Sequence, residues 1–159
     1  MSTWLQAVSE QEMEELERDP GLINRLDKPR YVRTHFSASI NYFVTGAAYP
    51  GPDHHPLWSM LDGGRSVACA TLENGAFGLV SPTEAGLMAR LVAEVDLADV
   101  VARIESADLD DLIGEEELED LELIDQDEAP TVIVNDLKEL TRFYADVAAE
   151  RLGVVMYTT

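Results

Sequence analysis

The sequence has few basic residues, a single cysteine and no long hydrophobic run. It contains 31 aspartates and glutamates against 11 lysines and arginines, so its formal net charge is −20. A polyanion is bound by neutralising its phosphates with Lys and Arg, and this charge balance therefore argues against nucleic acid and against anionic membrane surfaces as partners. No apolar stretch approaches the roughly 18 residues that a membrane span requires. We expect neither a nucleic-acid-binding nor a membrane protein.

The only cysteine, Cys69, can form no internal disulfide and lies in the small apolar run SVACATL. This context predicts a buried, reduced thiol without the neighbours that would activate a nucleophile. The N-terminal stretch MSTWLQAVSEQEMEELERDP is acidic almost from its start and lacks the basic and apolar regions of an export signal. We therefore expect a cytoplasmic protein, and 159 residues suit one compact domain.

In the first half of the chain, local signals predict both helices and strands. Residues 2–8 favour a strand, and Ser9 with Glu12 fits a capping box for a helix that ends near Asp19-Pro20. The elements expected next are a short helix at 21–27, a helix at 31–45 ended by Gly46, a proline-rich loop, and two strands at 65–80 around Asn74-Gly75.

The second half shows the strongest helix start, Ser81-Pro82-Thr83-Glu84, which leads a helical pattern to Ile104 with a break near Asp96. The β-branched run 130–134 predicts a buried strand, and Asn135 is the expected cap of a final helix. Gly153 ends that helix, and residues 154–157 are expected to form a last strand. Together these elements predict an α+β fold, with several helices packed around a small mixed sheet in a single compact domain.

Thirteen of the 24 residues from 105 to 128 are acidic and none is basic. A calcium loop beginning at Asp108 would place Leu112 where an oxygen ligand is needed and Ile113 where a sharp turn needs glycine. A disordered tail is disfavoured by the many aliphatic residues in the run. The spacing favours solvated helices, capped by Ser106 and broken at Gly114, whose leucines and isoleucines anchor the region to the core.

The exposed carboxylates of this region could form an electrostatic site for a basic protein partner, and Glu115, Glu116, Glu119 and Glu122 are the candidates. The alternative is that the acidity serves only solubility or salt adaptation. Both alternatives remain open at the level of the sequence.

Three histidines could carry chemistry: His35 in the expected helix, and His54 and His55 beside Asp53 in the proline-rich loop. Zinc needs three or four ligands, and no spacing here resembles a zinc motif, so we expect no metal and no cofactor. A second candidate binding region is the point where the helix end, with Asn41 and Tyr42, meets residues 53–55. No nucleophile elbow, phosphate-binding loop or dinucleotide fingerprint is present, and no catalytic residue can be named.

Several motifs follow one another in an order that resembles the YfbM-like family, a bacterial domain of unknown function. They are VSEQEMEELERDP after a first strand, INYFVTG, PLWSMLDGG, GAFGLVSPTEAGLMARLV and LTRFYADVAAERLGVVMYT. The resemblance covers nearly the whole chain and implies a cytoplasmic α+β domain without a known reaction. Members often carry Trp and His in the helix before Thr-Gly, where this sequence has Ser37 and Asn41, so an imidazole-dependent site there would be absent or altered.

These observations favour a non-enzymatic binding module whose acidic surface engages another protein. The alternative is a small hydrolase or transferase with a polar site near His35, His54 and His55.

Overall fold

In the described part of the chain, five short strands form one antiparallel sheet in the order β2-β1-β5-β4-β3. The computed structural model describes the chain except for residues 28–29, 48–50, 52, 54 and 116–117. The strands are β1 (Thr3–Val8), β2 (Tyr31–Thr34), β3 (Arg65–Ala68), β4 (Ala76–Val80) and β5 (Gly153–Thr158). The predicted α+β class is confirmed, although every strand pair is antiparallel where the sequence predicted a mixed sheet.

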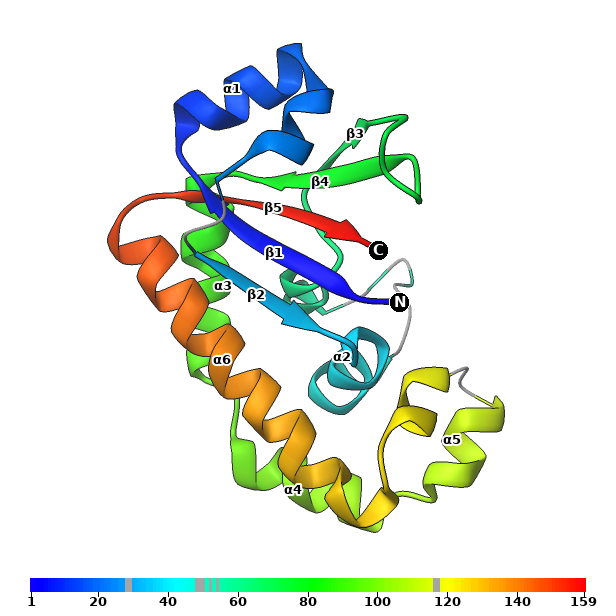
Figure 1. The fold of residues 1–159 in the computed structure, drawn as a ribbon. Helices are drawn as coiled ribbons and strands as arrows, with labels where there is room; N and C mark the ends of the chain where they lie inside the picture. The colour runs from blue at the N-terminus through cyan, green and yellow to red at the C-terminus, as the bar shows by residue number, and fades with distance from the viewer. Residues whose placement is uncertain (28–29, 48–50, 52, 54, 116–117) are drawn as a thin grey trace.

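Helices cover both faces of this sheet, which makes the central strand β5 apolar on both sides (Figure 1). Val155 and Tyr157 face a smaller apolar cluster with α1 (Glu10–Arg18) and η1 (Pro20–Arg25). Val154 and Met156 face the larger core, which includes α3 (Pro82–Ala93) and the long α6 (Ala129–Ala149). The alternation of a strand thus places consecutive residues of β5 in two different cores.

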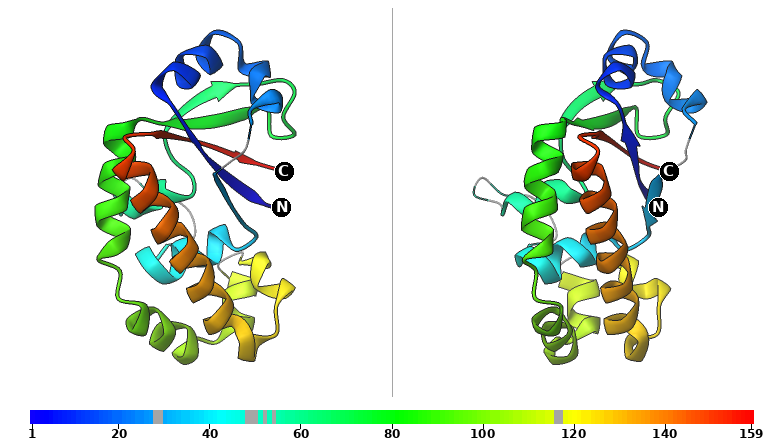
Figure 2. Two further views of the ribbon diagram at one scale, coloured as in Figure 1. Left: turned by 60° about the vertical axis from the view of Figure 1, so that its left-hand side comes forward. Right: turned by 90° about the vertical axis from the view of Figure 1, so that its left-hand side faces the viewer.

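Most of the remaining elements gather toward one end of α6, away from α1 (Figure 2). They are α2 (Ser37–Thr45), α4 (Leu97–Ser106), α5 (Leu109–Glu115), η3 (Glu119–Leu123) and η4 (Gln126–Glu128). The 3-10 helix η2 (Pro56–Met60) contacts both α2 and α3. The fully buried Tyr144 of α6 donates a hydrogen bond to the carbonyl of Met60 (2.7 Å) and so fixes η2 to the core. No helix of the described chain has the length and apolarity needed to cross a membrane.

Several of the helix-end signals of the sequence are confirmed. Ser9 and Ser81 each complete a capping box with the glutamate three residues later. Asp96 separates α3 from α4 and accepts hydrogen bonds from the first amides of α4. Gly46 ends α2 in the left-handed region, at φ 87°. These features depend on neighbouring residues alone, and the sequence therefore predicts them well.

Two element predictions are wrong. Residues 31–34 form strand β2 rather than the start of a helix, because they pair with β1 and bury Thr34. Residues 130–134 belong to α6 rather than to a strand, so Asn135 lies inside a helix and caps nothing. Ile133 is fully buried and continues the helical stripe of Leu137 and Leu140, and this packing outweighs the strand preference of β-branched residues.

The acidic region is docked on the protein, as its aliphatic residues predicted. Leu109, Leu118 and Leu121 are buried in the main core, whereas Leu123 is 64% exposed. The expected cap is wrong, however: Ser106 is the last residue of α4, and Asp108 accepts the hydrogen bond from the amide of Asp111. Helix α5 ends at Glu115, one residue after the break predicted at Gly114, and η3 begins at Glu119.

Candidate functional site

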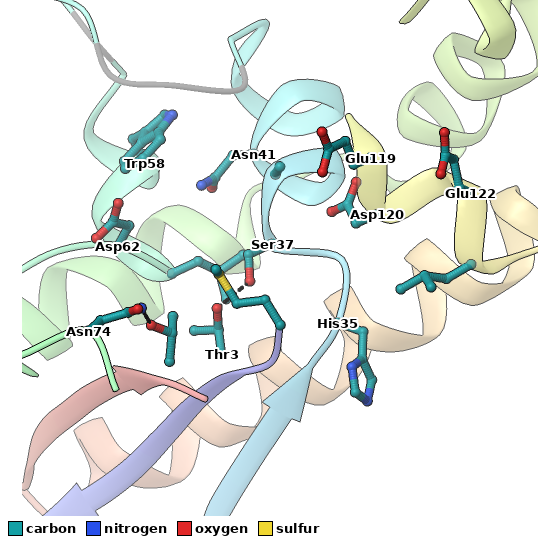
Figure 3. Close-up of a pocket in the computed structure, with 15 residues that line it drawn as sticks. Thr3, His35, Ser37, Asn41, Trp58, Asp62, Asn74, Glu119, Asp120 and Glu122 are labelled. Carbon is teal, nitrogen blue, oxygen red and sulfur yellow. Dashed lines mark hydrogen bonds between the residues drawn. The ribbon is translucent and has the colours of Figure 1, made fainter. Parts of the chain in front are cut away.

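A pocket of about 820 Å³ opens at one end of the sheet. There the start of β1 and the end of β5 meet the first turn of α2, the bend after η2, and the 3-10 helix η3 (Figure 3). Segments far apart in the sequence therefore build its wall. A smaller recess of about 260 Å³ adjoins it and shares Thr3, Leu61, Asp62, Asn74 and Thr158 with it.

Four carboxylates line this pocket, and none of its described lining residues is Lys or Arg. Glu119, Asp120 and Glu122 come from η3, and Asp62 comes from the bend after η2 on another side (Figure 3). The Asp62 side chain remains exposed to the pocket, yet the protein around it removes enough water to raise the pKa of its carboxyl group. The pocket is therefore a region of concentrated negative charge.

Asp120 has a structural task within this group. Its two carboxylate oxygens accept hydrogen bonds from the Ser39 amide (3.1 Å) and the Ser39 hydroxyl (2.5 Å). Helix α2 has no side-chain cap of its own at Phe36, so Asp120 serves as its N-terminal cap from 81 positions along the chain. The same contact holds η3 against the wall of the pocket.

Asn41 lies one turn further along α2, and its side chain points toward the space between Trp58 and Asp62 (Figure 3). It is only 2% exposed, and its amide oxygen Oδ1 has no hydrogen-bond partner among the described residues. The buried Trp58 forms another part of the wall, and its indole nitrogen donates to the carbonyl of Ala47 (3.3 Å). The pocket thus combines apolar walls with oxygen acceptors.

Hydroxyl groups and one histidine also line the pocket. Ser37 donates to the Thr3 hydroxyl (2.6 Å) at the junction of α2 and β1. His35 lies apart from the carboxylates (Figure 3). Its Nδ1 contacts the hydroxyl of the buried Ser2 (3.0 Å), which also accepts a hydrogen bond from Arg33. Within the placed residues, no three or more His, Cys, Asp or Glu side chains are grouped so that they could hold a metal ion.

The structure brings some of the residues suggested by the sequence together and separates others. His35, Asn41, Glu119 and Glu122 line the pocket. Four other candidates lie outside the described lining of the pocket. Tyr42 packs on the core and on Phe43, and His55 caps η2. Asp53 and Glu115 are exposed. Glu116 and His54 lie outside the described residues.

Three important residues of the pocket were missed by sequence reasoning: Trp58, Asp62 and Asp120. The sequence gives Asp62 no functional pattern, and Asp120 is one carboxylate among thirteen in its region. No local pattern distinguishes it from its neighbours, because its partner Ser39 is distant in sequence.

The chain has the fold of a solved structure described as a protein of unknown function, YfbM from Escherichia coli. The TM-score is 0.72 over 98% of both chains, at 15% sequence identity. The resemblance inferred from the sequence motifs is therefore confirmed at the level of the fold. No family model matches the sequence. No curated protein matches it either.

Proposed function

We propose that this protein is a non-enzymatic binding module that engages a positively charged segment of another protein at the acidic pocket. The observation that carries this proposal is the convergence of Asp62, Glu119, Asp120 and Glu122 on one pocket whose described lining contains no Lys or Arg. Here two segments separated by more than fifty residues contribute to the same cavity.

The acidic segment around this pocket strengthens its attraction for a cation. Charges act on one another over a Debye length of about 10 Å at 0.1 M salt, so the exposed carboxylates of α5 and η4 contribute to steering a basic partner toward the pocket. Such complementarity raises the association rate and selects against acidic partners. We therefore expect binding to weaken strongly as the salt concentration rises.

The geometry favours binding over the hydrolase or transferase that the sequence left as an alternative. A histidine or carboxylate that activates a serine as nucleophile needs a serine hydroxyl that a substrate can reach. The contact of His35 is with Ser2, which is only 4% exposed. The Ser39 hydroxyl beside Asp120 is completely buried. Neither hydroxyl is accessible to a substrate.

Fluorescence polarisation with labelled peptides of defined sequence tests the proposal. The probes are a Gly/Ser peptide with four basic residues and an acidic counterpart, each measured at about 50 and about 500 mM salt. The double variant Glu119→Gln/Glu122→Gln should bind the basic peptide more weakly than the wild type. The matched control Glu94→Gln/Glu105→Gln removes the same charge from exposed positions outside the described pocket lining and should bind nearly normally.

Two results would contradict the proposal. One is equal binding of the basic and acidic peptides by the wild-type protein. The other is an equal loss in the two double variants, because that would assign the effect to net charge and not to the pocket.

A further inference from the structure

We infer that the part of the pocket between Asn41, Trp58 and Asp62 is a subsite for an arginine side chain of the partner. This inference rests on the proposed function and specifies the group that the pocket receives. It starts from an unsatisfied atom and not from the carboxylates alone.

The Oδ1 atom of Asn41 is the first feature that indicates a ligand. Nearly all buried polar groups in native proteins have a hydrogen-bond partner, because burying one without a partner costs free energy. This oxygen is buried without a partner among the described residues, and its side chain is directed into the pocket (Figure 3). A donor supplied by a ligand would satisfy it.

The second feature that indicates a ligand is the chemistry of the residues around Asn41. Asp62 offers a carboxylate, and Trp58, Leu61 and Ala38 offer apolar surface in the same pocket. An arginine side chain combines an apolar stem with a planar cation that carries five donors, so it can use both kinds of wall at once. Its guanidinium group is also more weakly hydrated than the ammonium of lysine, which favours arginine in a partly buried site.

The size of the cavity indicates that the arginine belongs to a longer chain. The pocket continues into the smaller recess, where Gly63, Gly64 and Gly78 form part of the wall. A Cβ atom on Gly78 would lie 2.3 Å from the carbonyl oxygen of Gly63, so the close packing of these segments requires glycine and fixes the shape of the recess. The recess can receive residues adjacent to the arginine.

Calorimetric titration of the full chain with three capped tripeptides tests this inference. The probes are acetyl-Gly-Xaa-Gly-amide with arginine, lysine or citrulline at the centre. Citrulline keeps the shape of arginine and removes its charge. We expect the arginine peptide to bind most tightly, the lysine peptide about tenfold more weakly, and the citrulline peptide more weakly still.

Asn41→Leu should weaken the arginine peptide about tenfold to a hundredfold, which is the loss expected for a hydrogen bond between a buried acceptor and a charged donor. Gln6→Leu is the matched control, because Gln6 is also buried, also has an unpaired side-chain oxygen, and lies outside the described pocket lining. Asp62→Asn, at an exposed position, is a second test that does not disturb the core.

The outcomes separate this inference from the proposed function. Equal binding of the arginine and lysine peptides, or unchanged binding in both Asn41→Leu and Asp62→Asn, would overturn the arginine subsite and leave the binding of basic segments intact. If neither the arginine nor the lysine tripeptide binds, and the longer Gly/Ser peptide with four basic residues does not bind either, then both the arginine subsite and the proposed function are overturned.

Discussion

Replacement of Asp120 by alanine tests how the acidic segment is attached to the protein. The carboxylate of Asp120 accepts two hydrogen bonds from Ser39, one from its amide and one from its hydroxyl. Ser39 is completely buried, so water cannot readily replace the lost acceptor. The variant should therefore destabilise both the first turn of α2 and the docking of η3.

The expected loss can be worked out from these two contacts. A hydrogen bond to a charged group contributes about 1.5–3 kcal/mol to stability. The loss of a helix cap costs about 0.5–2 kcal/mol, and this cost is not added separately because the cap is one of the two hydrogen bonds. Asp120 itself is half-buried, which places the estimate toward the lower end. For two such bonds at the lower end, we expect the free energy of unfolding to fall by about 3 kcal/mol.

Urea denaturation followed by circular dichroism measures this change, and hydrogen exchange at the Ser39 amide shows whether the loss is local. Glu119→Ala and Glu122→Ala are the controls, since these neighbours are exposed and should alter stability by no more than about 0.5 kcal/mol. A loss for Asp120→Ala no greater than that of the controls would refute the assignment of Asp120 as a cap.

Three further predictions follow from burial, desolvation and capping. Leu118→Ala should lower the free energy of unfolding by about 2–5 kcal/mol in the same denaturation assay. Leu123→Ala, at an exposed position, should lower it by no more than about 0.5 kcal/mol. Similar losses in the two variants would show that η3 is not anchored by Leu118. Desolvation raises the pKa of Asp62 above its ordinary value of 3.8, so the folded protein retains this proton at pH values where the unfolded chain has lost it. The resulting contribution to stability is present below pH 3.8 and is lost as the pH rises through the raised pKa of Asp62. Asp62→Asn should remove this contribution from a measured profile of stability against pH. A profile that the substitution leaves unchanged would contradict the desolvation of Asp62. Ser81→Ala should lower the free energy of unfolding by about 1 kcal/mol, and a calorimetric melt that does not move would count against the capping box.

The candidate site was only partly predictable. Asn41, Glu119 and Glu122 were selected from the sequence and do line the pocket, together with His35. Their selection followed from local features: a helix end and a dense run of charge. The sequence did not indicate that these two features face one another, and it linked Asn41 to the proline-rich loop instead.

Helix boundaries and turns were determined largely by the sequence itself. Ser9, Ser81, Asp96 and Gly46 act on backbone groups within a few residues, so their effect can be inferred without a fold. The overall class followed from the same signals, because amphipathic helices and short apolar strands have few ways to bury their apolar faces.

Only the tertiary structure decided the identity of ambiguous segments and the composition of the pocket. Residues 31–34 became a strand through pairing with β1, and residues 130–134 became helical because Ile133 joins the buried stripe of α6. Asp120 was likewise distinguished from twelve other acidic residues of its region by its contact with Ser39, a partner 81 positions away. Interactions between distant segments leave no periodicity or spacing in the sequence, and they appear only when the chain has folded.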